Sequence, residues 1–422
     1  MVCRVVPLML AAQLCASALA ATPLRPAYDL QGPGLSVAYG GVGFLDVRSR
    51  NLVVNVGGPV ELALLYWTGR DRPCEREEPD GPCTVPEAGL FKDQQLRFQG
   101  ALVNGVLIGS EIQPDTNAGP INNIGYVADV TEIVADHAPG RQVYPVSDGD
   151  PANNLADLDG AGLLVVYRDP AVTRPARVIV YHGLDFAYGE DRTHGEAQVT
   201  DPFSFNHGAA RASVRRGRLV IFAGDAVDFA PDRIDIGHNP SPANQLNGSS
   251  GKSWDADAFT VDVPARVAAT TVQVVSEPVG LNPDSFLWVM AALWLPLPVP
   301  SGCADTFWGG SLGVWGAAAL KPTERVVDVF SEARSYGAAG TAVLRTAIRF
   351  QASGDLLGAA RGLVRMGIAA LLNAGHPGIE YPFTRTQVIT QVDTALRTRD
   401  TVKILELTDE LKAANGAGCP LS

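Results

Sequence analysis

The stretch Val60-Glu61-Leu62-Ala63-Leu64-Leu65-Tyr66-Trp67 sets the pattern for the first two thirds of the chain. Its residues alternate with period two, which is the side-chain period of a β-strand. Leu96 and Phe98 alternate with polar neighbours in the same way. Asn104-Gly105 then lies between two apolar runs, and this dipeptide is the strongest short signal for a β-hairpin. We therefore expect a hairpin that turns at these two residues.

Similar apolar runs continue as far as residue 295, and Gly, Pro, Asn and Asp occupy the gaps between them. The clearest runs cover residues 162–167, 177–181, 218–222, 258–263, 270–275 and 286–290. Many short strands separated by turn residues indicate antiparallel sheets rather than a parallel α/β fold. The sequence predicts a β-sandwich or jelly roll over residues 21–295, built as one sandwich or as two packed sandwiches.

The pattern changes at Pro296-Leu297-Pro298-Val299-Pro300-Ser301-Gly302, which we interpret as a Pro-rich linker over residues 296–302. After it the apolar residues recur with helical spacing. Pro322 and Thr323 open one predicted helix, and residues 356–372 form another. Thr384 and Gln387 fit a capping box, and Asp400 caps a last helix that ends at Gly416. Residues 303–422 are therefore predicted to form an all-α helical bundle.

The first twenty residues resemble a secretory signal peptide. Arg4 is their only charge, an apolar stretch follows, and Ala18-Leu19-Ala20 provides a small-x-small cleavage pattern. Export predicts a secreted, extracellular or cell-surface protein, with the periplasm as an alternative. No later segment reaches the roughly 20 apolar residues of a membrane-spanning helix, so no transmembrane segment is expected after signal cleavage.

The charge of the chain is acidic. The formal net charge is −12, and it becomes −13 when Arg4 leaves with the signal peptide. Nucleic acids and anionic membranes select basic surfaces, so neither is expected as a partner. An extracellular glycan or protein is the partner class that remains.

Four cysteines lie outside the signal peptide: Cys74, Cys83, Cys303 and Cys419. They allow three pairings, and an oxidising compartment favours disulfides over metal thiolates. Cys74 and Cys83 flank a short polar loop, while Cys303 and Cys419 bracket the whole C-terminal region. We expect these two local pairs, so that the second bridge closes the helical domain.

Two resemblances follow from these motifs. The β region resembles uncharacterised secreted bacterial β-sandwich domains, through Val103-Asn104-Gly105 and Val180-Tyr181-His182-Gly183 among other stretches. The C-terminal region is similar to a small helical domain of bacterial extracellular proteins, which opens with Gly-Cys and an aromatic-Trp pair. The matching residues are Gly302-Cys303, Phe307-Trp308 and Gly418-Cys419-Pro420-Leu421. Neither resemblance implies an activity or site residues.

Clustered carboxylates precede the strand at residues 162–167. Asp148, Asp150, Asp157 and Asp159 are hard oxygen donors of the kind that Ca²⁺ binds, and we assign them as candidate calcium ligands. The twelfth position from Asp148 holds Asp159 rather than a glutamate. Asp residues that form turns before a strand are the alternative interpretation. No other cofactor and no catalytic residue is predicted.

Other motifs are weaker. Gly309-Gly310-Ser311-Leu312-Gly313 matches the letters of a nucleophile elbow without the strand that an elbow requires. Residues 248–253 suggest a phosphate loop but lack its first glycine. A run of histidines and carboxylates between His182 and His207 suggests a zinc or acid–base site, although its spacing fits no ligand pattern. Trp67 and Trp254 are candidates for sugar stacking or for the core.

These observations favour a secreted or surface-associated non-enzymatic protein that serves in binding, adhesion or matrix assembly. A polysaccharide-active enzyme on a jelly-roll scaffold is the first alternative, because jelly rolls host such activities. Such an enzyme would need two carboxylates about 5–10 Å apart in one cleft. A calcium-dependent adhesion module is the second alternative.

Overall fold

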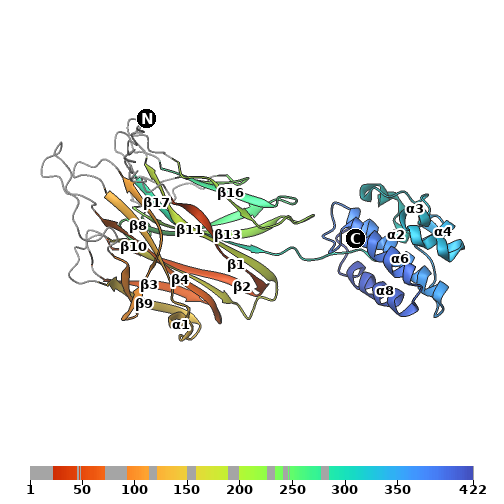
Figure 1. Ribbon diagram of the computed structural model, residues 1–422, viewed down its shortest axis with the longest axis horizontal. Helices are drawn as coiled ribbons and strands as arrows, with labels where there is room; N and C mark the ends of the chain where they lie inside the picture. Colours follow the sequence, from red (N-terminus) through yellow and green to blue (C-terminus); the bar gives the residue numbers. More distant parts are fainter. Residues whose placement is uncertain are drawn as a thin grey trace, which may run out of the picture.

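The computed structural model describes residues 22–44, 47, 49–71, 93–113, 121–149, 158–188, 199–225, 233–240, 246, 248–276 and 285–421. The predicted signal peptide and the predicted pair of Cys74 with Cys83 lie outside these residues. Antiparallel β-sheets fill the N-terminal part, and helices fill the C-terminal part. The predicted fold class is confirmed. Figure 1 shows the helices of residues 305–415 gathered at one end of the molecule, beyond the ends of the strands.

Four antiparallel sheets are stacked as layers, which we number 1 to 4. In pairing order, sheet 1 contains β3 (Ser49–Val56), β9 (Gly140–Asp148), β5 (Gln95–Phe98) and β6 (Ala101–Asn104). Sheet 2 contains β2 (Leu35–Gly43), β10 (Leu158–Arg168), β4 (Val60–Asp71), β8 (Ile121–Asp129) and β7 (Val106–Gln113). Sheet 3 contains β1 (Thr22–Pro33), β11 (Pro175–Tyr188), β17 (Ser285–Pro296), β13 (Arg215–Gly224) and β15 (Trp254–Val263). Sheet 4 contains β12 (Phe203–Asn206), β16 (Ala269–Val275) and β14 (Arg233–Ile236).

The strand order identifies two successive jelly rolls. If β2, β3, β4, β5, β6, β8, β9 and β10 are numbered 1 to 8, their sheets read 1-8-3-6 and 2-7-4-5, which is the jelly-roll order. Sheets 3 and 4 repeat it as β11-β17-β13-β15 and β12-β16-β14, with no fifth strand among the described residues. Figure 1 shows the layers from β3 and β9 at the bottom to β16 at the top.

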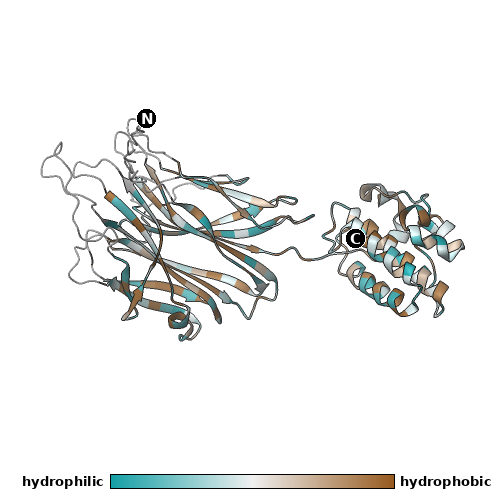
Figure 2. Cartoon of the chain, viewed as in Figure 1, coloured by the Kyte–Doolittle hydropathy of each residue, from teal (hydrophilic) through white to brown (hydrophobic). Residues whose placement is uncertain are grey.

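The two inner sheets are covered on both faces, because three hydrophobic cores separate the four layers. Tyr66 packs between sheets 2 and 3, whereas its neighbour Trp67 packs between sheets 1 and 2. Trp288 packs between sheets 3 and 4. Every residue from Leu158 to Tyr167 is therefore buried, which explains the continuous apolar run of this strand. Figure 2 shows hydrophobic residues along these central strands.

The prediction of a β-hairpin that turns at Asn104-Gly105 is wrong. β6 pairs with β5 in sheet 1, while β7 pairs with β8 in sheet 2, so the chain changes sheets at Gly105. A Cβ on Gly105 would lie 2.6 Å from the Trp67 ring, and this close passage explains the glycine. The hairpin turns instead at Gln99-Gly100, where φ is 53° and 78°. Two positive φ angles give the turn that suits twisted strands.

The helical domain is built around one long helix. Its elements are α2 (Asp305–Gly310), η2 (Leu312–Ala318), α3 (Val326–Val329), η3 (Ser331–Tyr336), α4 (Ala338–Thr341), α5 (Leu344–Ala347), α6 (Leu356–Gly375), α7 (Arg385–Thr398) and α8 (Thr401–Asn415). The capping box at Thr384 and the Asp400 cap are confirmed. The helix predicted after Pro322 is shorter than expected, because the backbone at Phe330 is extended. A further short helix that was not predicted, α1 (Thr131–Ala135), lies within the β region.

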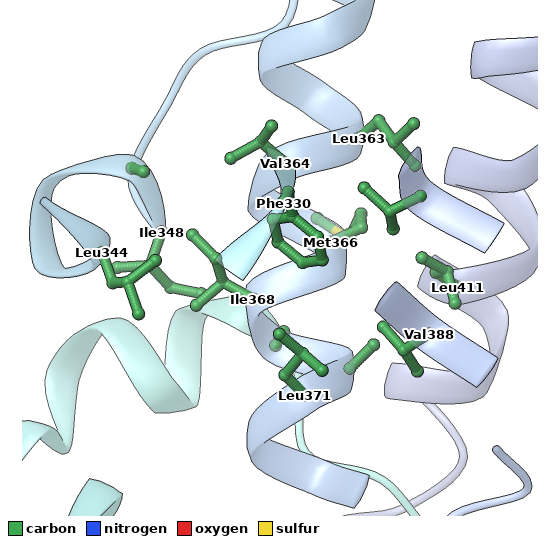
Figure 3. Packing of buried hydrophobic residues seen from close by; sticks show 14 of the residues in the cluster. Phe330, Leu344, Ile348, Leu363, Val364, Met366, Ile368, Leu371, Val388 and Leu411 are labelled. Atoms are coloured by element: carbon green, nitrogen blue, oxygen red, sulfur yellow. The ribbon is translucent and has the colours of Figure 1, made fainter. Parts of the chain in front are cut away.

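The core of this domain surrounds α6. Figure 3 shows Ile368 and Leu371 of this helix facing the side chains of Phe330, Leu344 and Val388. By length and composition α6 is apolar enough to cross a membrane, but 78% of its most apolar window is buried inside the protein. In this fold it is the central helix of the bundle. A disulfide joins Cys303 to Cys419, the pair expected to close the domain.

The two parts of the molecule are in contact. After β17, Ser301 and Glu380 exchange two hydrogen bonds, of 2.8 and 2.9 Å. The carboxylate of Glu380 also accepts from the backbone N–H groups of Arg211 and Ala212, which lie just before β13. The guanidinium of Arg211 donates to the Ala374 carbonyl at 2.7 Å, at the carboxyl end of α6. The linker is therefore supplemented by polar contacts between the jelly rolls and the helices.

Candidate functional site

The candidate calcium ligands are only partly described. Asp150 and Asp157 lie outside the described residues. Asp148 ends β9 in sheet 1, where it pairs with Leu96 in the ladder, and Asp159 lies in β10 of sheet 2. Within the described part of the chain, no group of three or more His, Cys, Asp or Glu side chains is placed to hold a metal ion. The calcium assignment stays a prediction.

Asp159 is buried and belongs instead to a partly exposed charge cluster that the sequence did not predict. Its Oδ1 lies 2.7 Å from Arg70, and its Oδ2 accepts a 2.9 Å hydrogen bond from the Thr68 hydroxyl. Arg70 also pairs with Asp225, which in turn accepts from Ser285. Asp159 and Arg70 come from sheet 2, whereas Asp225 follows β13 of sheet 3. The cluster therefore links the two inner sheets.

Electrostatics in this cluster follow from burial and pairing. Burial raises the pKa of the Asp159 carboxyl to about 6, and Arg70 offsets part of that effect. Burial acts against the charge of Arg70, but the two carboxylates outweigh it and raise the Arg70 pKa. A guanidinium between two carboxylates leaves one net negative charge. Asp159 and Asp225 both pair with the guanidinium of Arg70, which is typical of a structural ion-pair cluster.

The histidines and carboxylates between His182 and His207 do not converge in the described residues. Glu190, Asp191 and His194 lie outside them. The Nδ1 of His182 is 3.3 Å from the Tyr66 hydroxyl, whereas the Nε2 of His207 is 2.9 Å from the Thr270 hydroxyl. Burial lowers the pKa of both imidazoles. His182 and His207 therefore have different hydrogen-bond partners and do not form one site.

Asp185 lies in the same stretch and is almost fully buried. It accepts a 2.9 Å hydrogen bond from the backbone N–H of Asp201. Burial raises the pKa of the Asp185 carboxyl to about 7, so this group titrates near neutral pH. No cation contributes to its pKa, in contrast to Asp159.

The two letter motifs are loops with local roles. Ser311 lies between α2 and η2, so no strand precedes it and the nucleophile elbow is absent. In residues 248–253, the N–H groups of Gly248 and Ser249 donate to the carboxylate of Asp255. The loop that resembled a phosphate cradle therefore binds an anion of its own chain. Trp67 and Trp254 are fully buried, which supports their interpretation as core residues.

A cleft of about 390 Å³ lies where the edges of sheets 2 and 3 meet, and it involves β1, β4, β7, β8 and β11. Its apolar wall contains Leu64, Ile108 and Val127, and its polar wall contains Arg25, Asp129 and His182. Tyr28, Val106 and Leu107 complete the lining and remain exposed to solvent, by 36%, 67% and 42%. Burial, with the nearby Asp129, raises the pKa of the Tyr28 hydroxyl, so it stays protonated.

Sequence reasoning missed this cleft. The segment that forms β1 was not predicted as a strand, and its pairing with β11 joins residues about 150 positions apart. The exposed Val106 and Leu107 were assigned to a hairpin rather than to a sheet edge. Exposed apolar residues gathered at one concave site often mark a binding surface. The spacing of the cleft residues along the sequence does not indicate that they lie together.

No family model matches the chain, and no curated protein matches it. Among solved structures, the mavirus major capsid protein aligns with 64% of this chain and 86% of that chain, at 8% sequence identity and a TM-score of 0.14. A score of this size carries no argument about fold or function. The order of the strands in the four sheets is what identifies the two jelly rolls.

Proposed function

We propose that this protein is a secreted, non-enzymatic binding module that holds an extracellular glycan in the cleft between sheets 2 and 3. The signal-like residues 1–20 and the Cys303–Cys419 disulfide support export, since disulfides persist in oxidising compartments. The extracellular space or the cell surface is the proposed location, and the periplasm is the alternative. Matrix assembly or adhesion is the proposed role of such binding.

The observation that carries the proposal is the composition of the cleft. Tyr28 offers a partly exposed ring with a protonated hydroxyl, and an aromatic ring can stack on the apolar face of a sugar. Arg25, Asp129 and His182 add donors and acceptors for sugar hydroxyls. The volume of about 390 Å³ falls in the range of small-molecule sites. A few polar groups within an apolar wall provide orientation and specificity.

A glycan array with the mature protein, read with and without Ca²⁺, tests the proposal. Tyr28→Ala and Leu107→Ala should reduce the signal at the glycans that the wild type binds. Leu102→Ala is the matched control, because Leu102 is 45% exposed on sheet 1 and Leu107 is 42% exposed in the cleft. Equal binding by wild type and both cleft variants would refute the proposed site. A requirement for Ca²⁺ would favour the calcium-dependent adhesion alternative.

The enzyme alternative is tested on the same glycans. Product release from a bound glycan would show a polysaccharide-active enzyme instead of a binding module. Acid–base hydrolysis of a glycosidic bond needs one carboxyl to donate a proton while a second stays ionised. Among the described residues that line the cleft, Asp129 is the one carboxylate, whereas the neighbouring pairs Asp159 with Asp225 and Asp255 with Asp257 lie elsewhere. We therefore expect binding without hydrolysis.

A further inference from the structure

An arginine-lined cavity in the helical domain is separate from the cleft, and Leu312 is the residue of the Gly309–Gly313 motif that contributes to its lining. It has a volume of about 590 Å³ and lies between η2, the residues around α5 and the first turns of α6. Three of the side chains that line it are arginines, Arg345, Arg349 and Arg361. Thr346 and Gln351 add neutral polar groups, and none of the lining residues is acidic.

The walls of this cavity are held by contacts on its outer side. Arg349 donates to the carbonyl of Gly309 at the end of α2. Arg365, one turn beyond Arg361 on α6, donates to the Phe350 carbonyl at 3.0 Å and lies 3.4 Å from the Asp305 carboxylate. These bonds fix the segment after α5 against α6. The Arg349 guanidinium and the backbone that carries the Phe350 ring are thus held in place by the fold.

Two of the arginines have donors to spare. The Nε of Arg361 is buried and has no hydrogen-bond partner, while its guanidinium carbon lies 5.9 Å from the centre of the Phe350 ring. A buried donor without an acceptor costs free energy that a bound anion would recover. Arg345 is exposed and forms no ion pair with a described residue. Asp355 interacts electrostatically with Arg361, but its carboxylate accepts hydrogen bonds from Ser353 and from the N–H of Gly358 at the start of α6.

The distribution of charge in the chain also favours this cavity. Residues 303–422 contain 12 Lys and Arg and 11 Asp and Glu, a net charge of +1, so the remainder of the chain carries −13. Residues 341–366 contain four arginines and only one acid, Asp355. The cavity therefore lies in the part of this acidic protein that repels anions least. Its basic groups gather in one hollow instead of forming a long stripe, which suits a small anion rather than a nucleic-acid backbone.

We infer that this cavity binds a small ligand that carries a carboxylate, sulfate or phosphate group. The planar guanidinium fork matches the oxygens of such groups with paired hydrogen bonds, and charge-assisted bonds are the strong ones. Thr346 and Gln351 are placed to hydrogen-bond the rest of a polar ligand. The site is independent of the glycan cleft proposed above, since the two share no residues.

Calorimetric titration of the full-length mature protein tests this inference. The probes are inorganic sulfate, inorganic phosphate, glucuronate and glucose 6-phosphate, with neutral glucose as the comparator. Arg345→Gln and Arg361→Gln remove one cavity charge each, and Lys403→Gln removes one exposed charge from α8 as the matched control. Arg349 is left in place because it supports the Gly309 carbonyl.

At least one anionic probe should bind saturably, and glucose should not. Each cavity variant should weaken binding by about tenfold or more, the size expected for a lost charge-assisted bond, whereas Lys403→Gln should leave it nearly unchanged. If glucuronate or glucose 6-phosphate binds more tightly than sulfate and phosphate, the ligand is a saccharide that carries the anionic group. If sulfate or phosphate binds more tightly, the ligand is a free ion.

The inference is overturned if no anionic probe binds at millimolar concentration, or if the Lys403 variant loses as much affinity as the cavity variants. Arg345 is exposed, so its variant should fold even if the Arg361 variant does not, and thermal melting of each variant checks this. Arg345→Gln should leave glycan binding in the cleft unchanged. The two proposals can therefore fail separately.

Discussion

Replacing Cys303 and Cys419 together by alanine should strongly destabilise the helical domain. The bridge joins residues 116 positions apart, so it lowers the conformational entropy of nearly the whole domain in the unfolded state. In the chain-entropy account, a loop of this length corresponds to about 4.8 kcal/mol at 25 °C. That is a large part of the roughly 5–15 kcal/mol by which a domain of this size is stable.

Other contacts keep the two ends together in the folded state without the bridge. Gly302 donates to the Gly418 carbonyl at 3.0 Å beside the disulfide. The buried Asn373 side chain binds both the N–H and the carbonyl of Cys303, and it also binds Trp308 and Asn415. The native structure should therefore survive the double substitution. The loss should appear as easier unfolding, because the bridge acts mainly on the unfolded chain.

Urea denaturation followed by the helical circular dichroism signal measures the effect. With a denaturant slope of about 1–3 kcal/mol per molar urea, the midpoint should fall by roughly 1.6–4.8 M. The helical domain of the wild type under reducing conditions should behave like that of the double variant, and the helical transition of the double variant should not respond to reductant. A midpoint that falls by less than about 0.5 M would refute the argument that the bridge constrains the unfolded domain.

Two further predictions concern buried charges of the jelly rolls. Burial raises the folded-state pKa of Asp185 from 3.8 to about 7, so the native state loses stability as the pH rises from about 4 to 7. Asp185→Asn keeps an acceptor for the Asp201 N–H. The substitution should raise the melting temperature above pH 7 but not at pH 4. An equal shift of the melting temperature at both pH values would contradict this prediction. Arg70→Met leaves Asp159 and Asp225 without their cation and should cost about 3–5 kcal/mol in urea denaturation. Adding Asp159→Asn and Asp225→Asn should restore part of that loss, and a triple variant no more stable than the single one would show that charge is not the cause.

Local sequence signals were sufficient for the three long helices of the C-terminal domain, α6, α7 and α8. The Thr384 and Gln387 side chains form their capping box within four residues, and Asp400 caps its helix through a hydrogen bond to Val402 two residues away. Caps of this kind depend on neighbours in the chain, so they can be read from the sequence. The change from period two to helical spacing near residue 300 likewise places the end of β17 and the start of α2.

Strand pairing was not available from local signals. Asn104-Gly105 has the composition of a tight turn, yet the strands on its two sides belong to different sheets. β11 pairs with β17, whose partner residues lie about 110 positions later in the chain. Alternation shows that a segment is a strand, but it does not select the partner, because many strands offer similar apolar faces.

The sequence by itself determined the order of the architecture, strands first and helices second, and the cysteine pair that closes the helical domain. Composition and periodicity act over a few residues, and these features depend on little more. Only the tertiary structure decided which polar groups meet. Arg70 joins Asp159 and Asp225 across two sheets, and Arg345 and Arg361 line one cavity from two different helical segments. Such sites depend on the packing of distant segments, and that packing is fixed by the collective burial of three β cores and one helical core.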